Sequence, residues 1–319
     1  MLPAMEMRKL GSLEVSLVGL GCNNFGMRID EERSAAVVHA ALDAGINFFD
    51  TADVYGGTRS EQYLGRALAG RRDEVVIATK FVAPIDDDPS HAGAGARWVA
   101  EAVEGSLRRL GTDRIDLYQQ HGPDPNVPVE ETLTALDRLV RDGKVREIGN
   151  SNFSGEQIDD AESVSEEHGL ARFVSAQNHF NLLHREPLQD VVPVCVRRGL
   201  GVLPYFPLAS GLLTGKYRRG APAPDGTRLS QLPEERAARV MSDRNFDQVD
   251  ELSAFAAEHD HTILELAFAW LAAQPAMTSI IAGATRPEQV PANVEAVGWR
   301  LSDDDLAQLE QLFIAAGDG

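Results

Sequence analysis

Four residue types that can work together in acid catalysis stand at or just after the ends of apolar runs: Asp50, Tyr55, Lys80 and His121. Taken singly, Asp50 is also compatible with a helix cap or turn, Tyr55 with a rim aromatic and His121 with an ordinary loop histidine. A lysine that closes an apolar strand is harder to explain in this way. The combination of all four therefore indicates a catalytic site.

The chemistry that these four residues could perform is proton donation to a carbonyl oxygen. A free tyrosine has a pKa of ~10 and is a poor acid at neutral pH. An ammonium ~4 Å away favours the phenolate by roughly 4 kcal/mol at an effective dielectric constant near 20, or about three pKa units. We therefore expect Lys80 to lower the pKa of Tyr55, Asp50 to keep Lys80 charged and oriented, and His121 to donate a hydrogen bond to the carbonyl oxygen.

The elements that must position these residues alternate between strand and helix along the chain. Because apolar runs alternate with amphipathic helical patterns eight times, we expect an α/β fold, a (β/α)8 TIM barrel whose strand ends meet at one face. A hairpin over residues 7–11 and 13–18 is expected before it, and additional helices near 287–296 and 302–315 after it. The predicted strands are 15–20, 46–49, 75–79, 115–118, 145–148, 173–176, 201–204 and 278–281.

Length and composition are those of a globular protein with a single domain. The 319 residues show no shift in composition, so we expect one barrel domain over residues 1–319. The connection over residues 214–242 is longer than usual loops, which predicts that it is either functional or disordered.

The formal net charge of −19 argues against a nucleic-acid or membrane partner, and an anionic ligand would require locally gathered cations. Only two cysteines are present, and no Cys/His spacing typical of a metal site occurs. No signal peptide and no run of ~18 apolar residues is found, so a cytoplasmic location is expected.

Several segments, in order along nearly the whole chain, carry a family resemblance. They are DTADVYG, ATK, LYQQH, GNSNF, PYFPLASGLLTGKY and IIAGATRPEQVPAN. The chain resembles the aldo-keto reductase superfamily, and its bacterial aryl-alcohol-dehydrogenase-like and voltage-channel-β-like branches in particular.

The resemblance implies that NADP(H) binds without a Rossmann domain and that hydride passes from the nicotinamide to a small-molecule carbonyl substrate. It makes Tyr55 the proton donor, with Asp50, Lys80 and His121 as its partners. The helix that begins near Pro287 would present N–H groups to phosphate. The implied cofactor-binding residues are Ser151, Asn152, Gln177, Tyr205, Leu208, Gly211, Leu213, Lys216, Gly283, Arg286, Gln289 and Asn293.

Apolar walls for the substrate pocket are expected from Phe25 and Phe206, beside Tyr55 and His121. Asn150 departs from the family pattern because a small apolar residue is usual there, and Phe206 stands where a small residue is usual. The basic residue common at position 285 is replaced by Thr285, with Arg286 one position later. This shift weakens the preference for NADP over NAD, because the 2′-phosphate needs a cation.

Two other functions compete with carbonyl reduction. A regulatory or redox-sensing subunit would bind NADP(H) and turn over slowly, and turnover far below ~0.1 s⁻¹ would favour it over an enzyme with an ordinary rate. A Schiff-base aldolase would use Lys80 as nucleophile, but it leaves the GNSN and PYFPLASGLLTGKY segments unexplained. The sequence specifies neither the substrate, the direction of reaction nor the oligomeric state.

Overall fold

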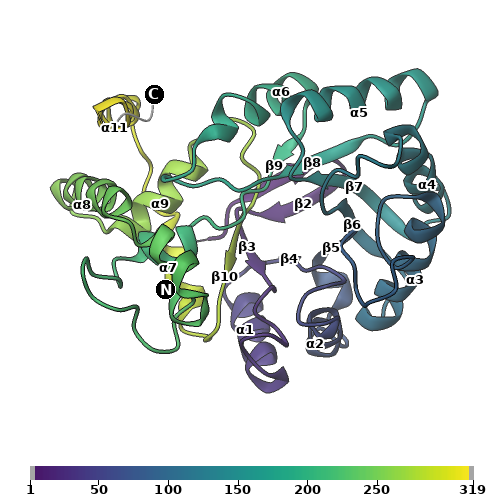
Figure 1. Ribbon diagram of the computed structural model, residues 1–319, viewed down its shortest axis with the longest axis horizontal. Helices are drawn as coiled ribbons and strands as arrows, with labels where there is room; N and C mark the ends of the chain where they lie inside the picture. The colour runs from purple at the N-terminus through teal and green to yellow at the C-terminus, as the bar shows by residue number, and fades with distance from the viewer. Residues whose placement is uncertain (1–3, 316–319) are drawn as a thin grey trace.

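Eight parallel strands form the centre of the computed structural model, which describes residues 4–315 (Figure 1). Their order is β10-β3-β4-β5-β6-β7-β8-β9. The ring closes between its end strands, where the Thr278 N–H donates to the Val202 carbonyl at 3.0 Å and the Ile281 N–H donates to the Pro204 carbonyl at 3.1 Å. The fold is the predicted (β/α)8 barrel. The strands are β3 (Val18–Gly21), β4 (Phe48–Asp50), β5 (Val76–Phe81), β6 (Ile115–Gln120), β7 (Val145–Ser151), β8 (Phe173–Gln177), β9 (Gly201–Val202) and β10 (Ile280–Gly283).

Helices follow the strands and surround the barrel, with α1 to α6 placed one after another around the strands in Figure 1. Several begin at a side chain that caps the free N–H groups of the first turn. Ser154 and Thr262 each form a capping box, at α5 and α9. The helices are α1 (Glu31–Asp43), α2 (Arg59–Ala67), α3 (Ala96–Leu110), α4 (Val129–Arg141), α5 (Gly155–His168), α6 (Val191–Arg198), α7 (Glu234–Val240), α8 (Asp243–Glu258), α9 (Ile263–Ala272), α10 (Gln289–Ala296) and α11 (Asp303–Ala315).

The N-terminal hairpin of β1 (Met7–Leu10) and β2 (Leu13–Ser16) is present as predicted. Its side chains Leu10, Leu13 and Val15 pack against the apolar cluster inside the barrel, which includes residues from the starts of the strands. The expected strand 15–20 is two strands, because Val15 and Ser16 finish the hairpin and the barrel strand begins only at Val18. A larger apolar cluster lies between the strands and the helices.

The long connection over residues 214–242 has structure of its own. It contains a short 3-10 helix, Leu229–Gln231, followed by α7. Arg28, from the loop after β3, donates to the carbonyl of Gly226 at 3.1 Å and to the side chain of Gln231 at 2.7 Å. These bonds attach the connection to the loops at the C-terminal end of the barrel. Within residues 4–315, no helix combines the length and the apolar character that crossing a membrane requires.

Candidate active site

Three adjacent strands carry the four residues that the sequence singles out. Asp50 ends β4, Lys80 is the last residue but one of β5, and His121 directly follows β6, while Tyr55 lies in the loop between β4 and α2. The Lys80 Nζ lies 2.6 Å and 2.8 Å from the two carboxylate oxygens of Asp50 and 5.2 Å from the centre of the Tyr55 ring. The Tyr55 and His121 rings meet edge to face, with centroids 5.6 Å apart. The structure thus brings together the side chains of Asp50, Tyr55, Lys80 and His121, hereafter the tetrad.

Lys80 is fully buried, and its ammonium is held on several sides. It donates to both oxygens of Asp50 and to the backbone carbonyl of Thr51 at 2.9 Å. Burial disfavours the ammonium, but the charge of Asp50 and the hydrogen bonds with Asp50 and Tyr55 outweigh this effect and raise the pKa of Lys80. A fixed positive charge therefore lies beside the phenol at neutral pH.

Two glutamine amides also donate to the carboxylate of Asp50. Gln119 and Gln177 donate to the same oxygen of Asp50 at 3.1 Å and 2.8 Å, and Gln177 also donates to Gln119 at 3.2 Å. Gln119 is absent from the residues found in the sequence, although its pairing with Lys80 in the β5–β6 register places the two side by side. A predicted strand that ran two residues further, over 115–120, would have included Gln119 and placed it beside Lys80. Gln177, expected at the nicotinamide carboxamide, contacts Asp50 in this structure.

The pKa of Tyr55 shifts in the direction opposite to that expected from the sequence. Burial raises the pKa of Tyr55, and the positive charge of Lys80 opposes this shift without reversing it. The sequence argument counted the charge of Lys80 and omitted the cost of removing a phenolate from water. In the protein alone, Tyr55 is therefore a neutral phenol that holds a proton, beside a cation that would stabilise the phenolate once the proton leaves.

His121 is a neutral imidazole at physiological pH. Burial, followed by the positive charge of Lys80, lowers the pKa of His121 to about 3. Its Nδ1 is buried and has no hydrogen-bond partner within residues 4–315, whereas its backbone carbonyl accepts from the side chain of Asn152 at 2.8 Å. A neutral imidazole keeps one N–H that it can donate to a carbonyl oxygen.

A polar edge beside His121 is formed by Ser151 at the end of β7, by Asn152 after it and by Tyr205 after β9. The Tyr205 hydroxyl donates to the Asn152 side chain at 2.8 Å, and the Ser151 hydroxyl donates to the Gln177 carbonyl at 2.8 Å. Asn152 and Phe206 both have a left-handed backbone, with φ of +60° and +54°. This conformation is costly for residues other than glycine and is typical of functional sites. These contacts fix the polar groups that the resemblance assigns to the nicotinamide end of a cofactor.

Two histidines stack in series on Tyr205. His179 stacks on Tyr205 with ring centroids 5.5 Å apart, and His184 stacks on His179 at 4.0 Å. Burial, followed by the charge of His184, lowers the pKa of His179 to about 4. The stack supports one face of Tyr205, so the orientation of that ring is fixed by neighbours on its own chain.

Four cations gather near the loops after β3, β9 and β10: Arg28, Lys216, Arg228 and Arg286. Burial and the charges of Arg28 and Arg286 lower the pKa of Lys216, and burial and the charge of Arg28, among others, lower that of Arg228. None of the four forms an ion pair with an acid of residues 4–315; Arg28 contacts neutral oxygens, and Arg228 lies 4.5 Å from the centre of the Phe206 ring. Sequence reasoning missed Arg28 and Arg228, which stand in loops without a periodic pattern.

Gly211 leaves space for one of these cations. It has φ of +94°, and a Cβ at this position would lie 2.6 Å from the Lys216 Nζ. Leu208 is half-buried nearby, whereas Leu213 is fully buried and packs in the outer core. Gly211 therefore lets the backbone approach the Lys216 ammonium closely.

The residues expected at the adenosine end lie around the start of α10. The Gln289 side-chain oxygen accepts from the backbone N–H groups of Thr285 and Arg286, at 2.8 Å and 3.1 Å. Asn293 is buried within α10, and Gly283 is exposed at the end of β10. Gln289 thus accepts hydrogen bonds from two backbone N–H groups just before this helix. Arg286 belongs to the same turn.

Phe25 does not form an accessible pocket wall. Its side chain is 0% exposed and belongs to the core between strands and helices. The neighbouring loops are packed so tightly that a Cβ on Gly56 would collide with the Phe25 backbone. This corrects the expectation for Phe25, whereas Phe206 is half-buried at the polar edge, as described above.

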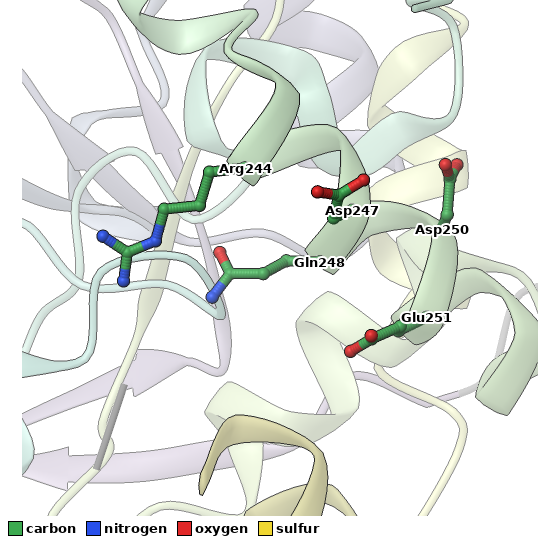
Figure 2. A pocket seen from close by; sticks show the side chains of 5 residues that line it. All are labelled: Arg244, Asp247, Gln248, Asp250 and Glu251. Atoms are coloured by element: carbon green, nitrogen blue, oxygen red, sulfur yellow. The ribbon is translucent and has the colours of Figure 1, made fainter. Parts of the chain in front are cut away.

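A surface hollow of about 460 Å³ on α8 carries none of these residues. Figure 2 shows its five lining side chains, Arg244, Asp247, Gln248, Asp250 and Glu251. They all come from one helix, α8, which Figure 1 places on the other side of the barrel from α3 and α4. The arrangement at the ends of β4, β5 and β6 is therefore the candidate active site.

The comparisons with known proteins assign this barrel, which carries the tetrad, to one protein family. The model of the Aldo/keto reductase family matches residues 17–314, so this chain belongs to that family.

Particular relatives include both enzymes and channel subunits by name. The chain is 36% identical over 326 residues to the uncharacterized oxidoreductase YrpG of Bacillus subtilis (strain 168), covering 98% of this chain and 97% of the relative. It is 35% identical over 308 residues to the aldo-keto reductase YhdN of the same strain, covering 94% and 91%. It is 34% identical over 300 residues to a probable voltage-gated potassium channel subunit beta of Oryza sativa subsp. japonica, covering 92% and 91%.

Proposed function

We propose that this protein is an NADP(H)-dependent oxidoreductase that reduces an aldehyde or ketone to an alcohol. The observation that carries the proposal is the juxtaposition of a neutral, half-buried Tyr55 phenol with the buried Lys80–Asp50 ion pair. This arrangement suits an acid that must hold a proton before the reaction and be stabilised as an anion after it.

The residues of the tetrad divide the work of proton transfer. The Tyr55 hydroxyl and a His121 N–H both donate to the substrate oxygen and polarise the carbonyl. As negative charge develops on that oxygen, the Tyr55 proton moves to it, and the Lys80 ammonium stabilises the phenolate. Asp50 holds Lys80 in place, and the amides of Gln119 and Gln177 hold Asp50.

The four unpaired cations fit a dinucleotide with several phosphates. A protein with a net charge of −19 that gathers Arg28, Lys216, Arg228 and Arg286 at one site, without acidic partners among residues 4–315, favours a polyanionic ligand there. This observation supports NADP(H) over NAD(H), because a 2′-phosphate adds two negative charges. When bound, the reduced nicotinamide supplies the hydride that the carbonyl carbon receives. Ser151, Asn152 and Gln177 would hold the carboxamide, and the ring of Tyr205 would stack on the nicotinamide.

The test is NADPH oxidation by the purified protein with an aromatic aldehyde such as 4-nitrobenzaldehyde. We expect NADPH fluorescence to change on binding and turnover within the ordinary enzymatic range of about 1–1000 s⁻¹. The proposal fails if NADPH does not bind, or if no aldehyde or ketone in a broad panel supports turnover.

A second candidate function is a regulatory or redox-sensing subunit, as the names of the channel-subunit relatives suggest. Such a subunit would keep the NADP(H) site and turn over slowly. A kcat far below ~0.1 s⁻¹ on every carbonyl, together with tight NADPH binding, would favour it over an enzyme. The intact tetrad supports the enzyme as the leading proposal.

A further inference from the structure

The loop that carries Tyr55 runs from the end of β4 to the start of α2. Thr51, which directly follows Asp50, and Ser60, the second residue of α2, are both 0% exposed. Between Tyr55 and α2 the backbone turns back sharply, because residues 56–58 all have a left-handed conformation with φ between +62° and +70°. The loop thus begins and ends at a buried hydroxyl group.

Ser60 forms hydrogen bonds to three segments of the chain. Its backbone N–H donates to the Tyr55 carbonyl at 3.2 Å. Its hydroxyl donates to the Cys22 carbonyl at 2.8 Å and lies 2.8 Å from the Thr51 hydroxyl. Because the single hydroxyl proton of Ser60 is used at the Cys22 carbonyl, the Thr51 hydroxyl is the donor to Ser60. Ser60 thus joins the two ends of the Tyr55 loop to each other and to the residue after β3.

The same bonds lead to the groups that hold the ammonium of Lys80. The Thr51 backbone carbonyl accepts from the Lys80 Nζ at 2.9 Å, and the Thr51 side chain is bonded to Ser60. The Cys22 N–H donates to the Asp50 carbonyl at 2.8 Å, and the Cys22 carbonyl is bonded to Ser60. The hydroxyl of Ser60 therefore connects to Thr51 and Asp50, the two residues that accept from Lys80.

The start of α2 is also held by bonds that do not involve the Ser60 hydroxyl. Glu61 is fully buried, accepts from the Thr79 hydroxyl at 2.6 Å and pairs with the Arg109 guanidinium at 2.6 Å. Leu64, one turn further along α2, is fully buried in the core between strands and helices. We therefore expect Ser60→Ala to fold with α2 in place and to loosen only the attachment of the Tyr55 loop.

We propose that Ser60 and Thr51 are positioning residues of the reductase, which hold the Tyr55 hydroxyl and the Lys80 ammonium in the geometry that proton transfer requires. The inference rests on the proposed function. Both hydroxyls are fully buried, so they act through the Tyr55 backbone and the Thr51 carbonyl and not by contact with the substrate. Because a misplacement of about 1 Å can lower a rate about a hundredfold, a small shift of the loop is sufficient.

The test is single-turnover oxidation of bound NADPH by 4-nitrobenzaldehyde, which measures the chemical step apart from product release. Thr51→Val keeps the branched shape of the side chain and loses the hydroxyl, and Ser60→Ala loses the side-chain bonds to both partners. Each should lower the single-turnover rate by about ten- to a hundredfold. The Kd of NADPH should stay within about threefold of the wild type, because neither residue belongs to the proposed cofactor site. Thr51→Ser, which keeps the hydroxyl, should restore the rate to within about threefold of the wild type.

Ser279→Ala is the matched control. Ser279 is 0% exposed, and its hydroxyl donates to the Ser16 carbonyl at 2.7 Å just before β10, at the end of the barrel opposite to the tetrad. The change removes the same kind of bond from an equally buried serine. The Tm should therefore fall, as it does for Ser60→Ala, while the single-turnover rate stays at the wild-type value.

The double variant Thr51→Val/Ser60→Ala tests whether the two hydroxyls act as one unit. Its rate should equal that of Ser60→Ala within about threefold, because the bond of Thr51 is already lost in that single variant. Independent effects of the two residues would instead multiply.

Hydrogen exchange gives a readout that needs no turnover. The Tyr55 carbonyl protects the Ser60 N–H, so a peptide that covers residues 51–60 should exchange at least about tenfold faster in Thr51→Val than in the wild type. In Ser279→Ala the same peptide should exchange as in the wild type.

The outcomes separate this inference from the proposed function. A wild type that oxidises NADPH with no carbonyl refutes the proposed function and the inference together. If the wild type reacts, single-turnover rates of Thr51→Val and Ser60→Ala within about threefold of the wild type overturn the inference alone. It is also overturned if Thr51→Ser is as slow as Thr51→Val, or if exchange over residues 51–60 is the same in all variants.

Discussion

Replacing Lys80 with methionine removes the charge that stabilises the Tyr55 phenolate and nearly preserves the volume of the side chain. At 5.2 Å, the distance from the Lys80 Nζ to the centre of the Tyr55 ring, two unit charges attract by roughly 3 kcal/mol at an effective dielectric constant near 20. If the full charge develops in the transition state, kcat should fall about 200-fold. The rate follows from the absorbance of NADPH at saturating aldehyde, and NADPH affinity should stay within about threefold.

The same substitution also affects stability, and this effect has to be separated from catalysis. Lys80→Met leaves the buried Asp50 carboxylate with only its amide donors, and losing one partner of a buried ion pair costs about 3–5 kcal/mol. The double variant Asp50→Asn/Lys80→Met removes both charges and should recover part of the free energy of unfolding without recovering turnover. Lys144→Met, which removes a surface lysine paired with Glu104, is the matched control. A Lys80→Met protein that turns over within threefold of the wild type would refute the reasoning.

The remaining predictions concern the cations and the pH dependence. Lys216→Met and Arg286→Met should each weaken NADPH binding by about ten- to a hundredfold, the effect of one charged hydrogen bond. The control Arg33→Met, which removes an exposed arginine on α1, should leave NADPH affinity unchanged. NADPH titrations that show equal affinities for all three variants would contradict the role of the cation cluster. For pH, the Tyr55 acid must be protonated and its pKa is raised, so kcat/KM for reduction should fall only as pH rises above about 10. His121 must be neutral and its pKa is about 3, so the profile should show no loss of rate near pH 6.5; a limb there would contradict the assignment of His121.

The positions of the four candidate catalytic residues could be predicted because they follow largely from chain order. A parallel barrel places the C-terminal ends of its strands at one face, so Asp50, Lys80 and His121 had to lie near one another once the eight strands were recognised. Tyr55 lies in a loop, so its position does not follow from strand order. Because it follows Asp50 by only five residues, it was still expected near the same face of the barrel.

The features that the sequence did not reveal depend on three-dimensional neighbours. Gln119 is a ligand of Asp50 only because of the β5–β6 register, and Arg228 reaches the site only because the 214–242 connection turns back towards it. The sign of the Tyr55 pKa shift depends on burial, which a sequence pattern does not give for a loop residue. Phe25 appeared suited to a pocket wall for the same reason, although it is packed in the core.

The central claim is that the Tyr55 hydroxyl supplies the proton, and the Tyr55→Phe variant tests it most directly. The phenyl ring keeps its contact with His121 and loses only the oxygen, so NADPH should bind as in the wild type. Aldehyde-dependent NADPH consumption should fall by at least about a hundredfold, the contribution of a general acid. Turnover close to that of the wild type, with NADPH bound normally, would show that the proton comes from another group.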